Sequence, residues 1–488
     1  MKKLSVKLFT AFAIVFCSNL LIAQTITVDG NVYLENQSNH DSIKIVFERT
    51  APSSLFDTAF TNINGEYSIS LQQGIYRITY SKTNYFNWVI YDTALYSNVI
   101  LQDITLYEKS TLLNVPSIFS NIQLAIDVSS NGDTILVESG TYYENLNFNG
   151  KNVILASEFI INQDTSYITN TIIDGNQNGR VIEFANGEDS TASIVGFTIM
   201  NGQTLGSSFP DDCGGGIYIS NSSPIIRHTI IKDNIANRSG GGIYCGNYTK
   251  PKFINVEISN NQAWWGGIAC DYGSTPILIN VKISENISSD GSIYLSNSNA
   301  IFKNVIISNN INGWSTSTGC AIYCDGSNPI IYNSTIINNT NGGGAINCTY
   351  SSNPTIYNSI IANNNVSHGG IYNVSGNPTI YNSCLWNNGI SNFYNCNSNL
   401  GVNITINNNG DSCDVFGNIQ IIPVFIDSLN CNLQAGSPCI DAGLNNYVDF
   451  QFDFEDNCRI YDGNSDSLFI VDMGAYEFAP AGTTFTNR

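Results

Sequence analysis

The sequence predicts an all-β protein in which a small Ig-like β-sandwich precedes a parallel β-helix. Three observations lead to this prediction. A short pattern centred on isoleucine recurs every 24 to 29 residues between residues 215 and 388. Within each repeat, apolar residues alternate over a few positions and then stop at Gly, Asn, Ser or Pro, as in short strands. Residues 25–108 lack this repeat and contain about seven short alternating segments, which is typical of a sandwich.

The repeat aligns one row of isoleucines and two rows of asparagines. Three short strands and three corners in ~25 residues describe one coil of a β-helix, and coils stack at the strand spacing of ~4.8 Å. Identical residues then lie above one another, so asparagines can chain their side-chain amides along the axis. About twelve coils fit within residues 133–430. The aligned residues are the interior Ile217, Ile243, Ile268, Ile293, Ile322, Ile346 and Ile371, the row from His228 through Asn255 to Asn382, and the row from Asn234 to Asn388.

The N-terminal region carries a recognisable stretch. Residues 61–85 read TNINGEYSISLQQGIYRITYSKTNY. This stretch resembles the carboxypeptidase regulatory-like domain, a β-sandwich of the same fold class as several carbohydrate-binding modules. The resemblance implies an accessory or spacer domain over residues 24–108.

The start of the β-helix also has a resemblance. Residues 109–132 form a junction, and helical spacing of apolar residues between Ser117 and Val128 predicts a short helix over the open end of the first coil. The next stretch, NGDTILVESGTYYENLNFNGKNVIL, is similar to the start of right-handed parallel β-helix proteins of the pectin-lyase-like superfamily. That superfamily includes polysaccharide lyases, glycoside hydrolases and non-enzymatic adhesins, so the resemblance implies the fold without choosing an activity.

The last block, residues 431–488, loses the repeat. Its motifs AGSPCIDAG, Arg459 and DMGAYE resemble the C-terminal segment of secreted bacterial β-helix proteins with a choice-of-anchor-type segment. We expect this block to close the β-helix as a cap. Within this block, a disulfide bond could form among Cys431, Cys439 and Cys458, which are close in sequence.

Composition and the N-terminus predict an exported protein. Residues 1–23 contain Lys2, Lys3 and Lys7 followed by an apolar run, the pattern of a signal peptide. No later stretch is long and apolar enough to span a membrane. The formal net charge of −20 argues against a nucleic-acid partner. We therefore expect a secreted or cell-surface protein whose partner is an extracellular polysaccharide or a cell-surface glycan.

Cysteines also recur with the repeat. Cys245 and Cys270 occupy the same coil position one rung apart, and Cys324 and Cys348 do the same. A rung of ~4.8 Å lies within the Cα range of a disulfide, but buried cysteines also pack well as small apolar residues. Both readings stay open at this point.

The charge map limits where catalysis could occur. A uronate lyase needs a basic side chain and commonly Ca²⁺, whereas a glycosidase needs two carboxylates. From Asn304 to Gly410 the only charged side chain is Asp325, so we expect any centre within residues 174–303 or in the C-terminal block. The catalytic candidates are Arg227, His228, Lys250 and Lys252, followed by Lys232, Asp233, Asp271 and Glu285. Each has a structural alternative; His228, for example, begins an asparagine row.

Acidic residues of the C-terminal block could bind a metal. They are Asp453, Glu455, Asp456 and Asp462. A calcium ion there would more often be structural than catalytic, and no cofactor is required by the sequence.

Tyrosines mark the predicted outer surface. If the isoleucines point inward, alternation sends two sets of tyrosines outward, where stacked rings flanked by Asn and Ser could bind sugars. Tyrosine also simply stabilises strands, which is the alternative. Our leading hypothesis is a non-catalytic carbohydrate-binding or interaction protein, with a polysaccharide lyase or glycoside hydrolase, or a structural adhesin, as alternatives. The tyrosines are Tyr218, Tyr244, Tyr294 and Tyr323 in one set and Tyr332, Tyr357 and Tyr381 in the other.

Overall fold

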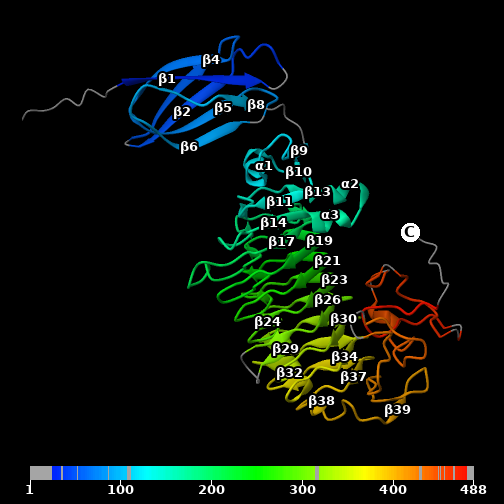
Figure 1. Ribbon diagram of the computed structural model, residues 1–488. Coiled ribbons are helices and arrows are strands. Elements are labelled where there is room, and N and C mark those ends of the chain that lie inside the picture. Colours follow the sequence, from blue (N-terminus) through cyan, green and yellow to red (C-terminus); the bar gives the residue numbers. More distant parts are fainter. Residues whose placement is uncertain are drawn as a thin grey trace, which may run out of the picture. The chain divides into compact units, whose positions relative to one another are not determined.

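The computed structural model consists of two compact units, Met1–Ser110 and Thr111–Arg488 (Figure 1). The predicted signal peptide and the predicted domain boundary at residue 108 lie outside the described residues. The structure describes residues 25–34, 37–51, 53–85, 87–106, 112–313, 318–427, 431–448, 450, 452–455, 457–464, 466 and 468–480.

The N-terminal unit contains two four-stranded sheets that share one core. Alternation in β1 buries Val28 and Val32, and alternation in β2 buries Ile45 and Phe47 against them. One sheet consists of β1 (Thr25–Leu34), β4 (Glu66–Gln72), β7 (Val99–Ile100) and β8 (Ile104–Leu106). The other consists of β2 (Lys44–Ala51), β3 (Leu55–Phe60), β5 (Gly74–Ser81) and β6 (Trp88–Leu95).

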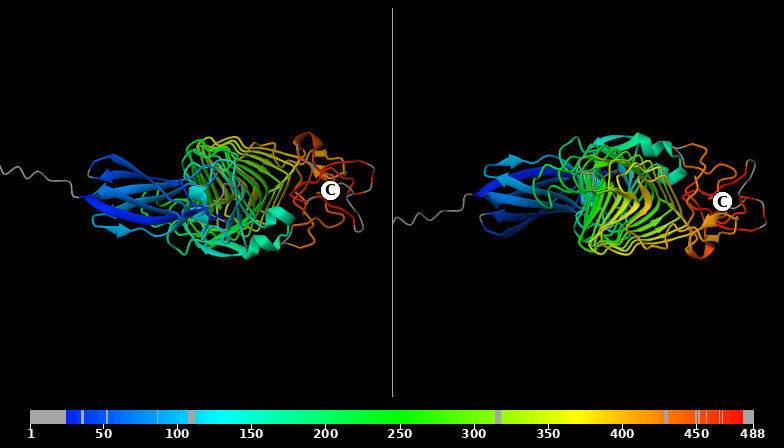
Figure 2. Two further views of the ribbon diagram at one scale, coloured as in Figure 1. Left: turned by 90° about the horizontal axis from the view of Figure 1, so that it is seen from above. Right: turned by 90° about the horizontal axis from the view of Figure 1, so that it is seen from below.

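The second unit is a right-handed parallel β-helix, as predicted, and three parallel sheets run along it (Figures 1 and 2). The first sheet contains β9 (Leu112–Val115), β10 (Thr134–Val137), β13 (Ile154–Ser157), β16 (Ser193–Val195), β26 (Ile301–Lys303), β30 (Ile330–Tyr332), β33 (Thr355–Tyr357) and β36 (Thr379–Tyr381). The second contains β11 (Gly140–Tyr143), β14 (Thr171–Asp174), β17 (Thr198–Met200), β27 (Ile306–Ser308), β31 (Thr335–Ile337), β34 (Ile360–Ala362) and β37 (Cys384–Trp386). Three longer strands bend at their middle and join both sheets: β19 (Ile225–Lys232), β21 (Lys252–Ser259) and β23 (Ile277–Ser284).

The third sheet has ten strands and carries most of the site described below. Its strands are β12 (Leu146–Asn147), β15 (Ile182–Phe184), β18 (Ile217–Ser220), β20 (Ile243–Gly246), β22 (Ile268–Cys270), β25 (Ile293–Ser296), β29 (Gly319–Asp325), β32 (Gly344–Thr349), β35 (Gly369–Asn373) and β38 (Ser391–Tyr394). Two small pairs complete the strands: β24 (Ile287–Ser288) with β28 (Ile311–Asn312), and β39 (Thr405–Ile406) with β40 (Ser412–Cys413). Besides helix α1 (Ile122–Val128), which is described below, the described residues form the helices α2 (Phe159–Asn162) and α3 (Ser166–Asn170) and the 3-10 helix η1 (Asn445–Tyr447).

The row from Asn234 to Asn388 is a buried hydrogen-bond ladder. The Asn310 amide nitrogen donates to Asn339 Oδ1 at 2.9 Å and to the Ile283 carbonyl at 3.0 Å. Asn310 Oδ1 accepts from the backbone and side-chain nitrogens of Asn286, both at 3.0 Å. The pattern repeats from coil to coil, so each asparagine satisfies corner groups that water cannot reach.

The other asparagine row has a different physical cause. Its residues adopt a left-handed backbone conformation, with φ between 45° and 54°, at the corner between the first and second sheets. Asparagine tolerates this conformation better than most residues. His228 occupies the first position with φ 49°, and its ring lies 4.7 Å from that of Phe159 in α2. This row therefore serves the corner backbone and leaves its side chains pointing outward.

A short helix covers the N-terminal end of the β-helix, as predicted, although it starts later. Helix α1 (Ile122–Val128) buries Ile122, Ala125 and Ile126. The Glu144 carboxylate accepts hydrogen bonds from the Ile122 and Gln123 backbone nitrogens at its N-terminus. Strand β9 precedes the helix and pairs with β10, so the first coil begins at Leu112, earlier than the predicted residue 133.

Residues 431–480, here called the C-terminal segment, lie along the side of the coils (Figures 1 and 2). The outward amides of Asn304, Asn333 and Asn358 donate to its carbonyls at 2.8 to 3.1 Å. The prediction that this block closes the end of the β-helix is therefore wrong. The corner asparagines direct amide donors to the side of the coils, and carbonyls of the segment accept from them there.

Charged groups are buried within the C-terminal segment. Arg459 is fully buried, and its guanidinium donates to the carbonyls of Asp472 and Gly474. Asp472 accepts hydrogen bonds from the Asp441 and Phe478 backbone nitrogens at 2.7 and 2.6 Å. Burial nevertheless dominates and raises the pKa of Asp472 to about 7.

We predict that Asn310→Ala lowers the free energy of unfolding by about 3 kcal/mol, because buried backbone and amide groups lose their partners. Urea denaturation would measure the change. The matched control is Asn328→Ala, since Asn328 makes the same kind of contact to Asn353 on the exposed surface. Equal losses in the two variants would show that the buried ladder contributes nothing special.

We also predict a pH-dependent stability that Asp472→Asn removes. The folded pKa of Asp472 lies above its ordinary value, so its contribution to stability is full at acid pH and is lost as pH rises through about 7. Thermal unfolding between pH 4 and 7.5 should show a smaller decrease for Asp472→Asn than for the wild type. The control Asp466→Asn changes an exposed carboxylate and should keep the wild-type decrease. A variant profile parallel to the wild type would contradict the prediction.

Candidate active site

Tyrosines of the third sheet form one outward column. Tyr218 and Tyr244 stack with ring centroids 5.3 Å apart, and Tyr294 and Tyr323 stack at 5.7 Å. Trp265 stacks on Tyr294 at 5.4 Å, on the coil where Ala269 replaces a tyrosine. In register, the column reads Asn147, Glu183, Tyr218, Tyr244, Ala269, Tyr294, Tyr323, Asn347, Tyr372 and Tyr394.

The outward direction of this column is as predicted, but its expected exposure is wrong. Tyr218, Tyr244 and Tyr294 are buried, and Tyr323 is half-buried. Neighbouring side chains cover these rings. The Arg180 guanidinium lies 3.9 Å above the Tyr218 ring, and the Phe209 ring lies 6.0 Å from the Tyr244 ring. These tyrosines support the surface and do not form it.

The second predicted strip is covered as well. Tyr332, Tyr357 and Tyr381 stack at 5.4 Å intervals on the first sheet, as expected. Tyr447 of the C-terminal segment stacks on Tyr357 at 3.8 Å, and Phe416 meets Tyr381 edge-on at 5.7 Å. The expectation of an open sugar-binding strip is therefore wrong here, because Tyr447 and Phe416, which come later in the chain, pack against these tyrosines.

Two carboxylates lie beside the buried tyrosine column. The Tyr244 hydroxyl donates to Asp271 at 3.4 Å, and the Tyr294 hydroxyl donates to Asp325 at 3.5 Å. Ser296 pairs with Asp325 in register, and its hydroxyl hydrogen-bonds Asp271. The two aspartates thus occupy the same coil position two rungs apart, about 10 Å between their Cα atoms. Both are partly exposed, so solvent reaches them.

The environment raises the pKa of carboxyl groups on this sheet. Burial raises the pKa of Asp271, and the nearby Asp325 carboxylate raises it further, although Arg238 and the Tyr244 hydroxyl oppose them. Burial also raises the pKa of Asp325, against the hydrogen bond from Tyr294. The pKa of Asp290, which contacts Thr318 and Trp265, is raised by burial too. Such shifted carboxyl groups are the kind that perform acid–base chemistry.

Sequence reasoning included Asp271 and excluded Asp325. It treated the single charge between Asn304 and Gly410 as too isolated to form a pair, but the partner lies on an earlier coil. The signal was present: Asp271 and Asp325 each follow the cysteine of an Ile-x-Cys repeat. Reading the charges by repeat position, and not along the chain, would have found the pair.

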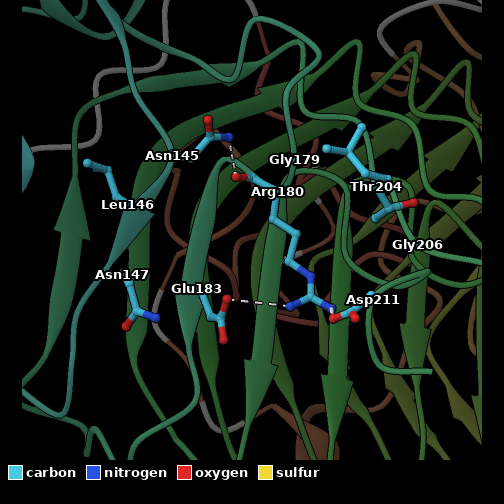
Figure 3. Close-up of a pocket in the computed structure, with 10 residues that line it drawn as sticks. Asn145, Leu146, Asn147, Gly179, Arg180, Glu183, Thr204, Gly206 and Asp211 are labelled. Carbon is cyan, nitrogen blue, oxygen red and sulfur yellow. Dashed lines mark hydrogen bonds and ion pairs between the residues drawn. The ribbon is translucent and has the colours of Figure 1, made fainter. Parts of the chain in front are cut away.

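A cleft of about 520 Å³ lies at the N-terminal side of the same sheet (Figure 3). Arg180 extends between two carboxylates, with contacts of 3.4 Å to Glu183 and 3.9 Å to Asp211. Its guanidinium also donates to the carbonyls of Cys213 and Pro210. Arg180 thereby anchors the long loop at residues 202–213, and its charge is already neutralised by these acids.

The predicted basic candidates lie on other sheets. Arg227 and His228 belong to β19, Lys252 begins β21, and Lys250 precedes it. The His228 ring packs on Phe159, and its Nε2 lies 3.5 Å from the Asn255 amide. The structure does not bring these side chains to the carboxylates of the third sheet. Lys232 and Asp233 form an exposed ion pair at 3.7 Å, as a solvated turn would, and Glu285 occupies a left-handed corner.

The predicted disulfides are not formed. All twelve cysteines that the structure describes are free. Cys245 with Cys270, and Cys324 with Cys348, stack in register as buried thiols, the alternative that the sequence left open. Cys431 and Cys439 belong to different core clusters, and Cys458 is exposed. The disulfide expected within the C-terminal segment is therefore absent among these three cysteines.

The predicted metal ligands do not gather in the described part of the chain. Asp453 accepts backbone hydrogen bonds from Glu455 and Glu477, and Asp462 accepts one from Asp466. No group of three or more His, Cys, Asp or Glu side chains placed to hold a metal occurs among the described residues. Asp456 lies outside them, and calcium stays a prediction. Within the same residues, no helix has the length and apolar character needed to cross a membrane.

One family model agrees with the architecture. The family model for the right handed beta helix region matches residues 182–343. No curated protein matches the chain significantly. Among solved structures, the pectate lyase Pel9A has a TM-score of 0.47 at 14% identity, covering 75% of this chain and 96% of that chain.

Two further structures resemble the chain more weakly. A pectin methylesterase in complex with hexasaccharide VII has a TM-score of 0.29 at 13% identity, covering 52% of this chain and 76% of that chain. The catalytic unit of a GH87 alpha-1,3-glucanase from Streptomyces thermodiastaticus strain HF3-3 has a TM-score of 0.22 at 11% identity, covering 76% and 87%.

We predict that Tyr357→Ala loosens the C-terminal segment, because the ring stack with Tyr447 is lost. Limited proteolysis within residues 431–480 should become about ten-fold faster, as expected for an aromatic contact of this kind. Tyr323→Ala, which removes a stacked ring on the third sheet, serves as control and should leave that rate unchanged. An unchanged rate in Tyr357→Ala would show that the stack does not hold the segment.

Proposed function

We propose that the protein is a glycoside hydrolase that cleaves an extracellular polysaccharide with Asp271 and Asp325 as its acid–base pair. The observation that carries the proposal is the placement of these two partly exposed carboxyl groups two rungs apart, each held by a tyrosine hydroxyl. Secretion, expected from the predicted signal peptide, fits a substrate outside the cell.

The separation favours an inverting mechanism. Inverting enzymes keep their carboxyl groups roughly 6.5–9.5 Å apart so that a water molecule fits beside the sugar. Two rungs of a β-helix, about 10 Å between Cα atoms, are compatible with that range. Retaining enzymes need a closer pair, at ~5 Å, which neighbouring rungs would provide.

The two aspartates take different roles. Asp271 acts as the general acid, because burial and the Asp325 carboxylate both raise its pKa. It gives its proton to the glycosidic oxygen as the bond to the anomeric carbon breaks. Asp325, the less deeply buried of the two, acts as the base. It takes a proton from the water whose oxygen bonds to the anomeric carbon from the opposite side.

Non-catalytic carbohydrate binding is the second candidate. Exposed aromatic side chains, namely Tyr248, Tyr272 and Tyr350, lie on the turns that follow the third sheet. Sugar rings stack on such side chains without any catalytic group. A lyase reaction has less support, because Arg227 and Lys252 lie on strands outside the third sheet and Lys250 precedes one of them.

We predict that Asp271→Asn and Asp325→Asn each lower hydrolysis at least 10²-fold, the usual contribution of a general acid or base. Reducing ends and unsaturated ends would be measured together on several polysaccharides. Asp233→Asn, which alters an exposed carboxylate outside the third sheet, should keep full activity. Unsaturated products would instead identify a lyase, and binding without any product would favour the second candidate.

The pH profile offers a second test. Hydrolysis should fall as pH rises through the raised pKa of Asp271, because the acid must be protonated. Residual activity of Asp325→Asn should show this alkaline limb at lower pH than the wild type, since removing the Asp325 charge lowers the pKa of Asp271. An alkaline limb that does not move would contradict the assignment of Asp271 as the acid.

A further inference from the structure

The turns after six consecutive strands of the third sheet, β18 to β32, have a nearly constant shape. In these turns, the residue that follows the carboxylate position has a left-handed backbone, with φ between 48° and 59°. Asparagine or glycine occupies most of these positions, as expected for this conformation. Two coils depart from that rule with Tyr272 and Tyr350, at φ 52° and 48°. The asparagine and glycine positions are Asn221, Asn247, Asn297 and Gly326.

The turn conformation does not favour tyrosine at these positions. Left-handed backbone is unfavourable for a bulky side chain, and an asparagine would serve the turn better. Tyr272 is 52% exposed with its ring 6.1 Å from that of Phe209, and Tyr350 is 73% exposed, so neither residue belongs to the core. Unfavourable backbone kept at exposed positions points to a role at the surface.

The two tyrosines flank turn positions with smaller residues, Asn297 and Gly326, here called the gap. Backbone hydrogen bonds order the turns from Tyr272 through Asn297 and Gly326 to Tyr350. Three rungs separate the two tyrosines, or about 14 Å. Gly326 has no side chain and the Asn297 amide lies beside it, so the side chains between the two tyrosines are short. Asp271 and Asp325 directly precede Tyr272 and Gly326 in sequence and so lie along this gap.

The charges around the gap disfavour an anionic ligand. Asp271 and Asp325 are both acidic. The nearby cation Arg238 is paired with Asp212 at 4.0 Å and stacks over Trp265 at 4.8 Å. A chain of uronates would meet like charges here, and Arg238, the cation that acts on Asp271 among the described residues, is already paired.

We propose that the substrate is an uncharged polysaccharide that lies parallel to the helix axis across this gap. One sugar ring stacks on Tyr272 and another on Tyr350, and the bond between them that is cleaved lies over the carboxylates. This inference rests on the proposed hydrolase for the cleavage step, but the stacking and the neutral charge of the ligand do not depend on it.

The test varies the charge of the polysaccharide and the length of the oligosaccharide offered to the protein. Uncharged polysaccharides (a mixed-linkage glucan, a xylan and a mannan) and polygalacturonate would be offered to the full chain, followed by oligosaccharides of increasing length from any glycan that is cleaved. Tyr272→Ala and Tyr350→Ala should lower kcat/KM about ten-fold for oligosaccharides long enough to reach both rings. For the shortest cleaved oligosaccharides, at least one of the two variants should match the wild type. Tyr143→Ala, which removes an exposed tyrosine of β11 on the second sheet, is the matched control and should have no effect.

The outcomes separate this inference from the proposed function. Hydrolysis of polygalacturonate but of no uncharged glycan would overturn the inference and leave the hydrolase intact. No hydrolysis of any substrate would overturn the hydrolase, and affinity electrophoresis would then decide the inference. Retardation by an uncharged glycan that disappears in Tyr272→Ala or Tyr350→Ala supports it. Absence of retardation by all uncharged glycans overturns it, as does equal kcat/KM in wild type and both variants at every length.

Discussion

Parallel pairing of one coil on the next is the constraint on which the rest of this structure depends. It places equivalent residues about 4.8 Å apart in every sheet, so a sequence repeat becomes a spatial column. Interior isoleucines, the asparagine ladder, thiol stacks and tyrosine stacks are all consequences of this register. The ladder through Asn310 matters most, because it satisfies buried corner groups that have no other partners.

The outer surface of the coils has two different roles on two of its sheets. On the first sheet, stacked tyrosines and the outward amides of the corner asparagines bind the C-terminal segment. On the third sheet, the tyrosine column is covered by the loop at residues 202–213 and by the side chains of Arg180 and Trp265. What stays open is a narrower strip, where Asp271, Asp325 and two exposed tyrosines face solvent. Covering most of an aromatic surface leaves a defined site and reduces exposed apolar area.

The candidate site shows how a solenoid assembles acid–base chemistry from few charges. Low overall charge in the coils means that each carboxylate has few neighbours, so burial dominates the pKa of Asp271 and Asp325. Their separation is set by the number of rungs between them, because the backbone register is rigid. A change of one coil would alter the distance by a full rung, which is enough to exchange one hydrolytic geometry for another.

The sequence by itself determined the coil, its interior and its two asparagine rows, since these depend on local alternation and on a period that repeats in register. It also determined the outward direction of the tyrosines. Tertiary structure alone decided which outward residues are accessible, because covering segments such as Tyr447 and Phe209 come from distant, non-repeating parts of the chain. It likewise decided that Asp325 has a partner, because proximity across coils follows from stacking and not from position along the chain.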